Sequence, residues 1–248
     1  MFPNLHVFSF IVPLYPLCVA AGFLIGTVIV MYLGKKLEIS ENKSFILMCF
    51  VEIGVILGGK ILFLVVNIHN LARIFENLGF LAVFTKTGFV FFGGLFGGII
   101  AVLAFSKIYK FLFREILSLV LSVAPLIHAI GRIGCLCAGC CYGIEWARQT
   151  AIFIHNAYRF PIQLLEALLN LILFFILQVF FIQKKEFIIP LYFGGYGIIR
   201  FFCEFFRGDM QRGFIGVLSV SSWISIVCIL LCILEFFCIR KLRYTCNE

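Results

Sequence analysis

Residues 128–143, HAIGRIGCLCAGCCYG, carry the most chemically capable side chains of this 248-residue chain. They place Arg132 among glycines and cysteines, directly after an apolar run. An arginine inside a bilayer costs roughly 2.5–3.5 kcal/mol, so it normally faces a protein interior, a watery cleft or an anionic partner. Gly131 and Gly134 permit sharp turns and let backbone N–H groups point at a ligand. We interpret the stretch as an anion pocket at the membrane surface; the alternative is a glycine-rich turn after a helix, with a snorkelling arginine.

The cysteines of this stretch form a C-x-C-x2-C-C cluster, made of Cys135, Cys137, Cys140 and Cys141. A local disulfide is the preferred interpretation, because thiols outside the cytoplasmic membrane can be oxidised. A zinc or iron–sulfur site is less favoured, since all of its ligands would come from one short loop. A third hypothesis is a nucleophilic or acceptor cysteine whose pKa is lowered by Arg132. Plain packing is the fourth.

A second polar stretch is residues 158–166, YRFPIQLLE. Pro161 suits the first turn of a helix, where its missing N–H is not needed. Gln163 and Glu166 follow at a spacing of three residues, which places both side chains on one helix face. We therefore expect a polar pair near the end of a membrane span.

A third polar stretch is residues 194–209, GGYGIIRFFCEFFRGD. On a helix, Arg200, Glu204 and Arg207 have the spacing i, i+4, i+7, so they are expected to lie on one stripe. Charged side chains in a span are costly unless they serve a function, which favours a binding or catalytic role. The alternative is a buried ion pair with a structural role.

Two pairs of glycines occur in the segment FFGGLFGG: Gly93 and Gly94, then Gly97 and Gly98. Glycines at this spacing commonly let two membrane helices pack closely. Contact with a ligand is an equally weighted alternative.

The composition predicts a polytopic membrane protein of a single domain, residues 1–248. Hydrophobic residues make up 63% of the chain and charged residues 13%, whereas about 25% charged residues is typical of soluble domains. The formal charge of +8 follows from the tendency of cytoplasmic loops to carry lysine and arginine, so we expect no nucleic-acid partner. The N-terminus lacks a basic segment and a small-residue cleavage site, so the first span is expected to stay.

Apolar windows of about 20 residues predict an all-α fold with about seven transmembrane helices. The windows are 12–33, 44–66, 88–106, 115–131, 161–182, 188–206 and 218–239. The distribution of basic residues favours an N-terminus outside and a C-terminus in the cytoplasm. In that orientation the inner loops are rich in lysine and the outer segments in arginine, whose planar fork suits phosphate recognition. The outer face is therefore expected to be the working face.

The order and spacing of these motifs resemble a known family. FFGGLFGG, the GRIG segment, RFPIQLLE and GYGIIRFFCEFFR are similar to motifs of the prolipoprotein diacylglyceryl transferases of bacterial inner membranes, over roughly residues 15–225. The resemblance implies a multi-pass enzyme of the bacterial cytoplasmic (inner) membrane. Such an enzyme moves the diacylglyceryl group of phosphatidylglycerol to the lipobox cysteine of a prolipoprotein and releases glycerol phosphate. Its partners would be phosphatidylglycerol, the prolipoprotein signal peptide and the membrane, with no cofactor and no metal.

The resemblance also implies roles for individual residues. Arg132 and Arg200 would act on the phosphate, Glu204 would orient Arg200, and Arg207 would be an outer electrostatic guide. The remaining lipid-binding positions implied by the family motifs are Gly93, Gly94, Gly131, Gly134, Tyr15, Gln163 and Glu166. Preorganised positive charge is needed because negative charge develops on the departing phosphate.

The sequence departs from the family pattern at the positions that would handle protons. Phe92 stands where a histidine is usual, and Cys135, Ala138 and Cys140 stand in place of two asparagines and an acid. His128 is the nearest imidazole in sequence, and it is expected to be a packing residue. The acid–base group of the reaction is therefore unassigned.

Two alternatives to transfer from phosphatidylglycerol to a prolipoprotein follow from these departures. One is a divergent paralogue that acts on another lipid or acceptor through its cysteine cluster. The other is a non-catalytic lipid- or ion-binding membrane protein that retains the scaffold.

Overall fold

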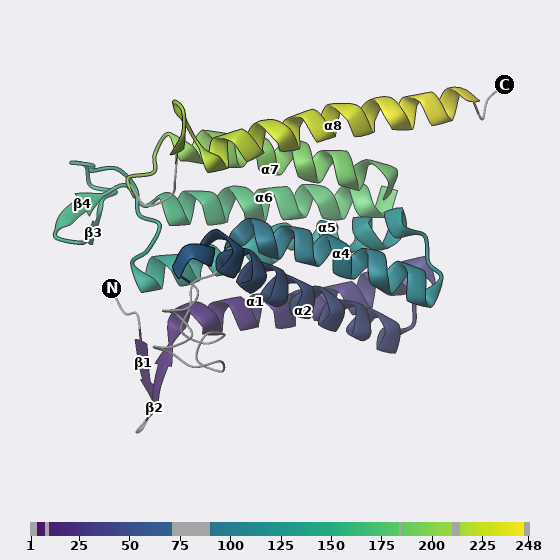
Figure 1. Cartoon of the computed structure of the whole chain (residues 1–248), viewed down its shortest axis with the longest axis horizontal. Coiled ribbons are helices and arrows are strands. Elements are labelled where there is room, and N and C mark those ends of the chain that lie inside the picture. The colour runs from purple at the N-terminus through teal and green to yellow at the C-terminus, as the bar shows by residue number, and fades with distance from the viewer. Residues whose placement is uncertain (1–3, 8–9, 71–89, 184, 210–213, 246–248) are drawn as a thin grey trace. The chain divides into compact units, whose positions relative to one another are not determined.

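Helices dominate the computed structural model, which describes residues 4–7, 10–70, 90–183, 185–209 and 214–245. The long helices among these residues are α1 (Leu14–Gly34), α2 (Glu41–Val66), α4 (Phe91–Tyr109), α5 (Phe113–Ala138), α6 (Ile162–Gln183), α7 (Ile188–Glu204) and α8 (Val220–Thr245) (Figure 1). Short 3-10 helices follow some of them: η1 (Lys35–Leu37), η2 (Ile68–Asn70) and η3 (Lys185–Phe187). Each long helix falls on one of the predicted apolar windows.

Strands within the described ranges form three small antiparallel hairpins. They pair β1 (Asn4–Val7) with β2 (Phe10–Pro13), β3 (Ile152–Ile154) with β4 (Ala157–Arg159), and β5 (Phe214–Ile215) with β6 (Leu218–Ser219). The hairpins are short and lie between helices in sequence or before the first. The prediction of a mainly helical membrane protein is therefore confirmed.

Five helices in the described part of the chain are long and apolar enough to cross a membrane. They are Leu14–Leu37, Glu41–Val66, Phe113–Ala138, Ile162–Gln183 and Val220–Arg240. Helix α4 is apolar but shorter over Gly93–Tyr109, and α7 has 17 residues. This supports a multi-pass membrane protein, whereas a total of seven spans stays a prediction.

The described residues form two compact units, and the single-domain expectation stays a prediction. In the unit Val30–Leu117, α2 and α4 pack closely because glycines face each other. A Cβ atom added to Gly54 would lie 2.5 Å from the Gly97 carbonyl oxygen, and one added to Gly93 would meet the Gly58 carbonyl oxygen. The packing interpretation of the paired glycines is thus confirmed for Gly93.

The other unit comprises Met1–Ile29 and Ser118–Glu248. Within it, α6, α7 and α8 run side by side, and the β3–β4 hairpin lies at the end where α6 begins (Figure 1). Helix α7 approaches α8 closely at Gly197, where an added Cβ would lie 2.9 Å from the Ser225 carbonyl oxygen. This unit holds most of the residues expected to do chemistry.

Helix α5 continues past the predicted end of its span at residue 131 and includes Arg132. Gly134 lies inside the helix where α1 packs closely against α5. A Cβ atom added at this position would lie only 2.9 Å from the Cβ of Cys18 in α1. The alternative of a glycine-rich turn at Gly131 and Gly134 is therefore wrong, since both residues are helical. Their N–H groups belong to the helix rather than to a ligand pocket.

Candidate active site

Glu166 lies at the centre of a buried cluster of charged side chains. It projects from α6 with 1% of its surface exposed. Arg132 and His128 reach it from α5, and Arg200 reaches it from α7. The His128 Nε2 to Glu166 Oε1 distance is 3.3 Å, the Arg200 Nη1 to Glu166 Oε2 distance is 3.5 Å, and Arg132 Nη2 donates to Glu166 Oε2. Three segments distant in sequence thus converge on one carboxylate.

Helical spacing explains how α5 supplies two of these groups. His128 and Arg132 are four residues apart, so they lie on the same face. His128 also packs against Tyr196 of α7, with ring centroids 5.4 Å apart. His128 therefore packs as expected from the sequence, and its ring nitrogen also contacts the Glu166 carboxylate. This contact places His128 at the edge of the charged cluster.

A second carboxylate holds Arg200 from its own helix. The Arg200 Nη2 to Glu204 Oε2 distance is 3.1 Å, and the same nitrogen donates to Ser221 Oγ of α8 at 2.7 Å. Arg132 and Arg200 are 8% and 9% exposed, and an unpaired ion at such burial costs several kcal/mol. The paired carboxylates make the burial of these two arginines tolerable and fix where their guanidinium groups point.

Arg132 presents an open hydrogen-bond donor within the cluster. Arg132 Nε is buried and has no hydrogen-bond partner within the part of the chain that the structure describes. A buried polar group without a partner is expensive, so such a group often marks a ligand position. Gln163 Oε1 is in the same state.

Polar side chains continue the cluster along one face of α6. Gln163, Glu166 and Asn170 are all buried, at spacings of three and four residues. The predicted pairing of Gln163 and Glu166 on one face is confirmed. The Asn170 side-chain amide donates to the Glu166 carbonyl oxygen at 2.7 Å. Asn170 was missed in the sequence, where its position one turn beyond Glu166 in an apolar run was the available signal.

The end of α5 brings three cysteines together. Gly139 has φ 72°, and the Cys140 N–H donates to the Cys135 carbonyl oxygen at 3.1 Å. This is the hydrogen bond of a glycine-terminated helix end, which turns the chain back on itself. The sulfur atoms of Cys135, Cys140 and Cys141 lie within 4.8 Å of one another. Cys137 is not among them.

All four cysteines of the cluster are free thiols in the structure, so the preferred disulfide interpretation does not describe it. Hydrogen bonds with Cys135 and Cys140 lower the pKa of the Cys141 thiol, and the positive charges of Arg132 and Arg207 act in the same direction. A low pKa beside an arginine agrees with the third sequence-based hypothesis.

Arg207 does not lie on the stripe predicted for it. Helix α7 ends at Glu204, because the following backbone pairs with residues 142–144 instead of continuing the helix. The Ile144 N–H donates to the Phe206 carbonyl oxygen at 2.9 Å. Arg207 is buried and binds Asp209 through two of its nitrogens. The predicted common stripe is therefore confirmed for Arg200 and Glu204 only.

The remaining predicted positions differ in how near they lie to the cluster. Tyr15 is 43% exposed on α1 and interacts electrostatically with Cys135 and Arg132. An atom added at Gly131 would meet nothing within 4 Å, so open space lies beside it. Gly93 and Gly94 belong to the unit Val30–Leu117, and their predicted role in lipid binding stays a prediction.

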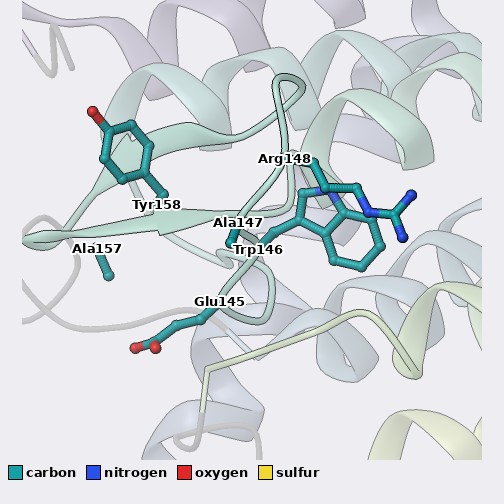
Figure 2. A pocket seen from close by; sticks show the side chains of 6 residues that line it. All are labelled: Glu145, Trp146, Ala147, Arg148, Ala157 and Tyr158. Carbon is teal, nitrogen blue, oxygen red and sulfur yellow. The ribbon is translucent and has the colours of Figure 1, made fainter.

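A surface hollow of about 610 Å³ lies beside the β3–β4 hairpin, at Ala157 and Tyr158 of β4 (Figure 2). It is lined by Glu145, Trp146, Ala147, Arg148, Ala157 and Tyr158. The Arg148 guanidinium carbon lies 5.2 Å from the centre of the Trp146 ring, a cation–π arrangement. None of the residues expected to do chemistry lines this hollow.

The family described as prolipoprotein diacylglyceryl transferase matches residues 4–238 of the chain. The chain belongs to this family. A Clostridium tetani protein named phosphatidylglycerol–prolipoprotein diacylglyceryl transferase is 32% identical to it, over 90% of this chain and 91% of that protein. A Clostridium perfringens protein with the same name and the suffix 2 is 30% identical, over 89% and 88%. A Campylobacter jejuni relative of that name is 29% identical, over 94% and 92%.

Membership in this family confirms the resemblance seen in the sequence motifs. The matched region contains every residue of the buried cluster around Glu166, as well as the three cysteines that end α5.

Proposed function

We propose that this chain transfers the diacylglyceryl group of phosphatidylglycerol to the lipobox cysteine of a prolipoprotein and releases glycerol phosphate. The convergence of Arg132 and Arg200 on Glu166 is the observation that carries this proposal. Two guanidinium groups held from different helices form a rigid binding site for a phosphodiester. The names of the bacterial relatives support the substrate pair.

The reaction breaks the bond between phosphate oxygen and glyceryl carbon. The acceptor thiol releases its proton to solvent, its sulfur attacks that carbon, and a C–S thioether bond forms. The electron pair of the broken C–O bond leaves with glycerol phosphate. Negative charge on the leaving phosphate is stabilised by Arg132 and Arg200, which are preorganised by their carboxylate partners. The Nε donor of Arg132, which has no partner among the described residues, would add a hydrogen bond to the phosphate.

The other cluster residues act by positioning the two arginines. Glu204 orients Arg200, with which it pairs at 3.1 Å, and Glu166 sets the distance between Arg200 and Arg132. Gln163 holds the loop after α5, because its side-chain amide donates to the Cys140 carbonyl oxygen at 2.8 Å. Arg207 is buried and paired, so we assign it to the charge balance near Cys141 rather than to outer guidance.

The membrane arrangement we propose follows the sequence analysis. Seven spans place the N-terminus outside and the C-terminus in the cytoplasm of a bacterial inner membrane, within a single domain. The prolipoprotein would bind through its signal peptide, and no nucleic acid takes part. Helix α7, with 17 residues, would be the span that carries Arg200 and Glu204.

Purified protein in detergent tests the proposal with phosphatidylglycerol and a lipobox peptide. The release of glycerol phosphate and the mass gain of the peptide are measured together. We expect Arg132→Ala and Arg200→Ala to lower turnover by about 100-fold or more, since loss of one preorganised donor commonly costs 10²–10³. Arg148→Ala is the matched control, because Arg148 is exposed and lies outside the cluster.

Equal turnover in the two cluster variants and in Arg148→Ala would contradict the proposed role of the arginines. Binding of phosphatidylglycerol by the wild-type chain without any product would instead identify a non-catalytic lipid-binding protein.

A further inference from the structure

The loop after α5 is held in place from several sides. His155 Nε2 donates to the Gly139 carbonyl oxygen at 3.0 Å, and Gln163 donates to that of Cys140 at 2.8 Å. The Gly208 N–H donates to the Tyr142 carbonyl oxygen at 3.0 Å. The carbonyl groups of Gly139, Cys140 and Tyr142 therefore have fixed partners. A loop anchored in this way presents its side chains in a defined arrangement.

The backbone of the loop is strained at Cys141, whose thiol belongs to the group of three sulfurs. Cys141 has φ 55°, in the left-handed region, which costs a non-glycine residue about 1–3 kcal/mol. This conformation follows the left-handed Gly139 and turns the Cys141 sulfur toward Cys135 and Cys140. Strain of this kind persists where the surroundings enforce it, and it clusters at functional sites.

The distances between the three sulfurs suit one shared metal ion. Tetrahedral zinc binds thiolate sulfur at about 2.3 Å, which places two sulfurs of one site about 3.8 Å apart. The sulfurs of Cys135, Cys140 and Cys141 all lie within 4.8 Å, so a small contraction is enough. Cys140 is exposed, which gives an ion and a further ligand a way in.

We propose that Cys135, Cys140 and Cys141 bind a zinc ion whose fourth position takes the acceptor thiol of the proposed transferase reaction. Catalytic zinc sites have three protein ligands and one open position. Thiolate ligands select soft or borderline ions such as zinc. This inference rests on the proposed function for the identity of the acceptor, and it replaces the sequence-based expectation of no metal.

The charge of such a site is balanced by its neighbours. Three thiolates and one zinc ion carry a net negative charge, and binding of a fourth thiolate increases it. Arg132 Nη1 lies 3.8 Å from the Cys135 sulfur, and Arg207 interacts electrostatically with Cys141. The same two arginines would thus stabilise the metal site and keep it beside the phosphate position.

Zinc supplies the step for which the sequence has no acid–base group. A thiol that coordinates zinc loses its proton, which is released to solvent. The bound thiolate sulfur then attacks the glyceryl carbon, the C–S bond forms, and the electron pair of the C–O bond leaves with glycerol phosphate. Zinc does not change its oxidation state. Phe92 stands where the family has a histidine. Because the metal lowers the pKa of the acceptor thiol, no other side chain has to act as a base in place of that histidine.

Metal analysis of the purified, reduced full-length chain tests the site itself. We expect one zinc ion per chain. Serine substitution at Cys135, Cys140 or Cys141 is expected to lower zinc affinity by about 100-fold or more, since even outer contacts of a metal site contribute 10–100-fold. Cys137→Ser is the matched control and should retain zinc. Absence of zinc, or its retention in all three variants, would overturn the proposal.

Cobalt(II) in place of zinc tests the open position without any turnover. Thiolate-to-cobalt absorption bands should grow when a lipobox peptide is added, because its thiolate becomes the fourth ligand. A peptide with serine in place of the lipobox cysteine should leave the bands unchanged. Identical spectra with both peptides would overturn the assignment of the acceptor to the metal.

Transfer measured after zinc removal separates this inference from the proposed function. We expect activity to disappear on chelation and to return with zinc but not with magnesium. Undiminished transfer by metal-free protein would overturn the metal proposal and leave the proposed function intact. Zinc binding and peptide coordination without transfer would support the metal site while contradicting the proposed function.

Discussion

Glu166→Gln tests whether one carboxylate holds the buried cluster together. The substitution keeps the side chain's shape and removes the negative charge that faces Arg132, Arg200 and His128. Breaking a buried ion pair through one partner costs about 3–5 kcal/mol, because the other charge stays buried without compensation. Glu204 still pairs with Arg200, so the uncompensated charge falls on Arg132. We therefore expect a loss of about 3–4 kcal/mol, in the lower part of that range.

Thermal unfolding in one detergent and at one heating rate measures this loss. For a chain of about 250 residues, 1 kcal/mol corresponds to about 2–4 °C in Tm, so Glu166→Gln should lower the Tm by about 6–16 °C. Glu145→Gln is the matched control. The Glu145 side chain is 75% exposed and lies 3.8 Å from Arg159, and such a surface pair contributes about 0–1 kcal/mol. A Tm change no larger than that of the control would refute the central role of Glu166.

Further predictions concern the positioning of the two arginines and the ends of the helices. Glu204→Gln should lower kcat by about 10–100-fold with a smaller change in KM, because Arg200, 3.1 Å away, loses the carboxylate that orients it. Steady-state kinetics check this, and Glu204→Asp should recover part of the lost kcat. Gly134→Ala should cost about 1–3 kcal/mol through its contact with α1, whereas Gly131→Ala, which meets open space, should not destabilise; thermal unfolding compares the two. Gly139→Ala should weaken zinc binding, because alanine disfavours φ 72° by about 1–2 kcal/mol; a zinc titration measures it.

The sequence predicted most of the helices, because their apolar runs are long and continuous. It also predicted the shared face of Gln163 and Glu166, since helical spacing alone determines it. The ends of α5 and α7 were predicted less well. Glycine is compatible with a helix interior where a neighbouring helix comes close, as at Gly134, and the end of α7 depends on backbone pairing with residues distant in sequence.

The charged cluster was only partly predictable, because it depends on contacts between residues that are distant in sequence. Arg132, Arg200 and Glu204 were selected individually, but their common partner Glu166 requires knowledge of how α5, α6 and α7 face one another. The convergence of the cysteine sulfurs depends on two left-handed residues in one turn. Gly139 was a visible signal for the first of these, whereas nothing in the sequence marks Cys141 as left-handed.

The most direct test of the central claim follows the diacylglyceryl group itself. Purified protein is incubated with phosphatidylglycerol labelled in its diacylglyceryl moiety and with a lipobox peptide, and the peptide is analysed by mass spectrometry. The account predicts that the label appears on the peptide cysteine as a thioether, in equal amount with released glycerol phosphate. Phosphatidylglycerol that binds but leaves the peptide unlabelled would contradict it.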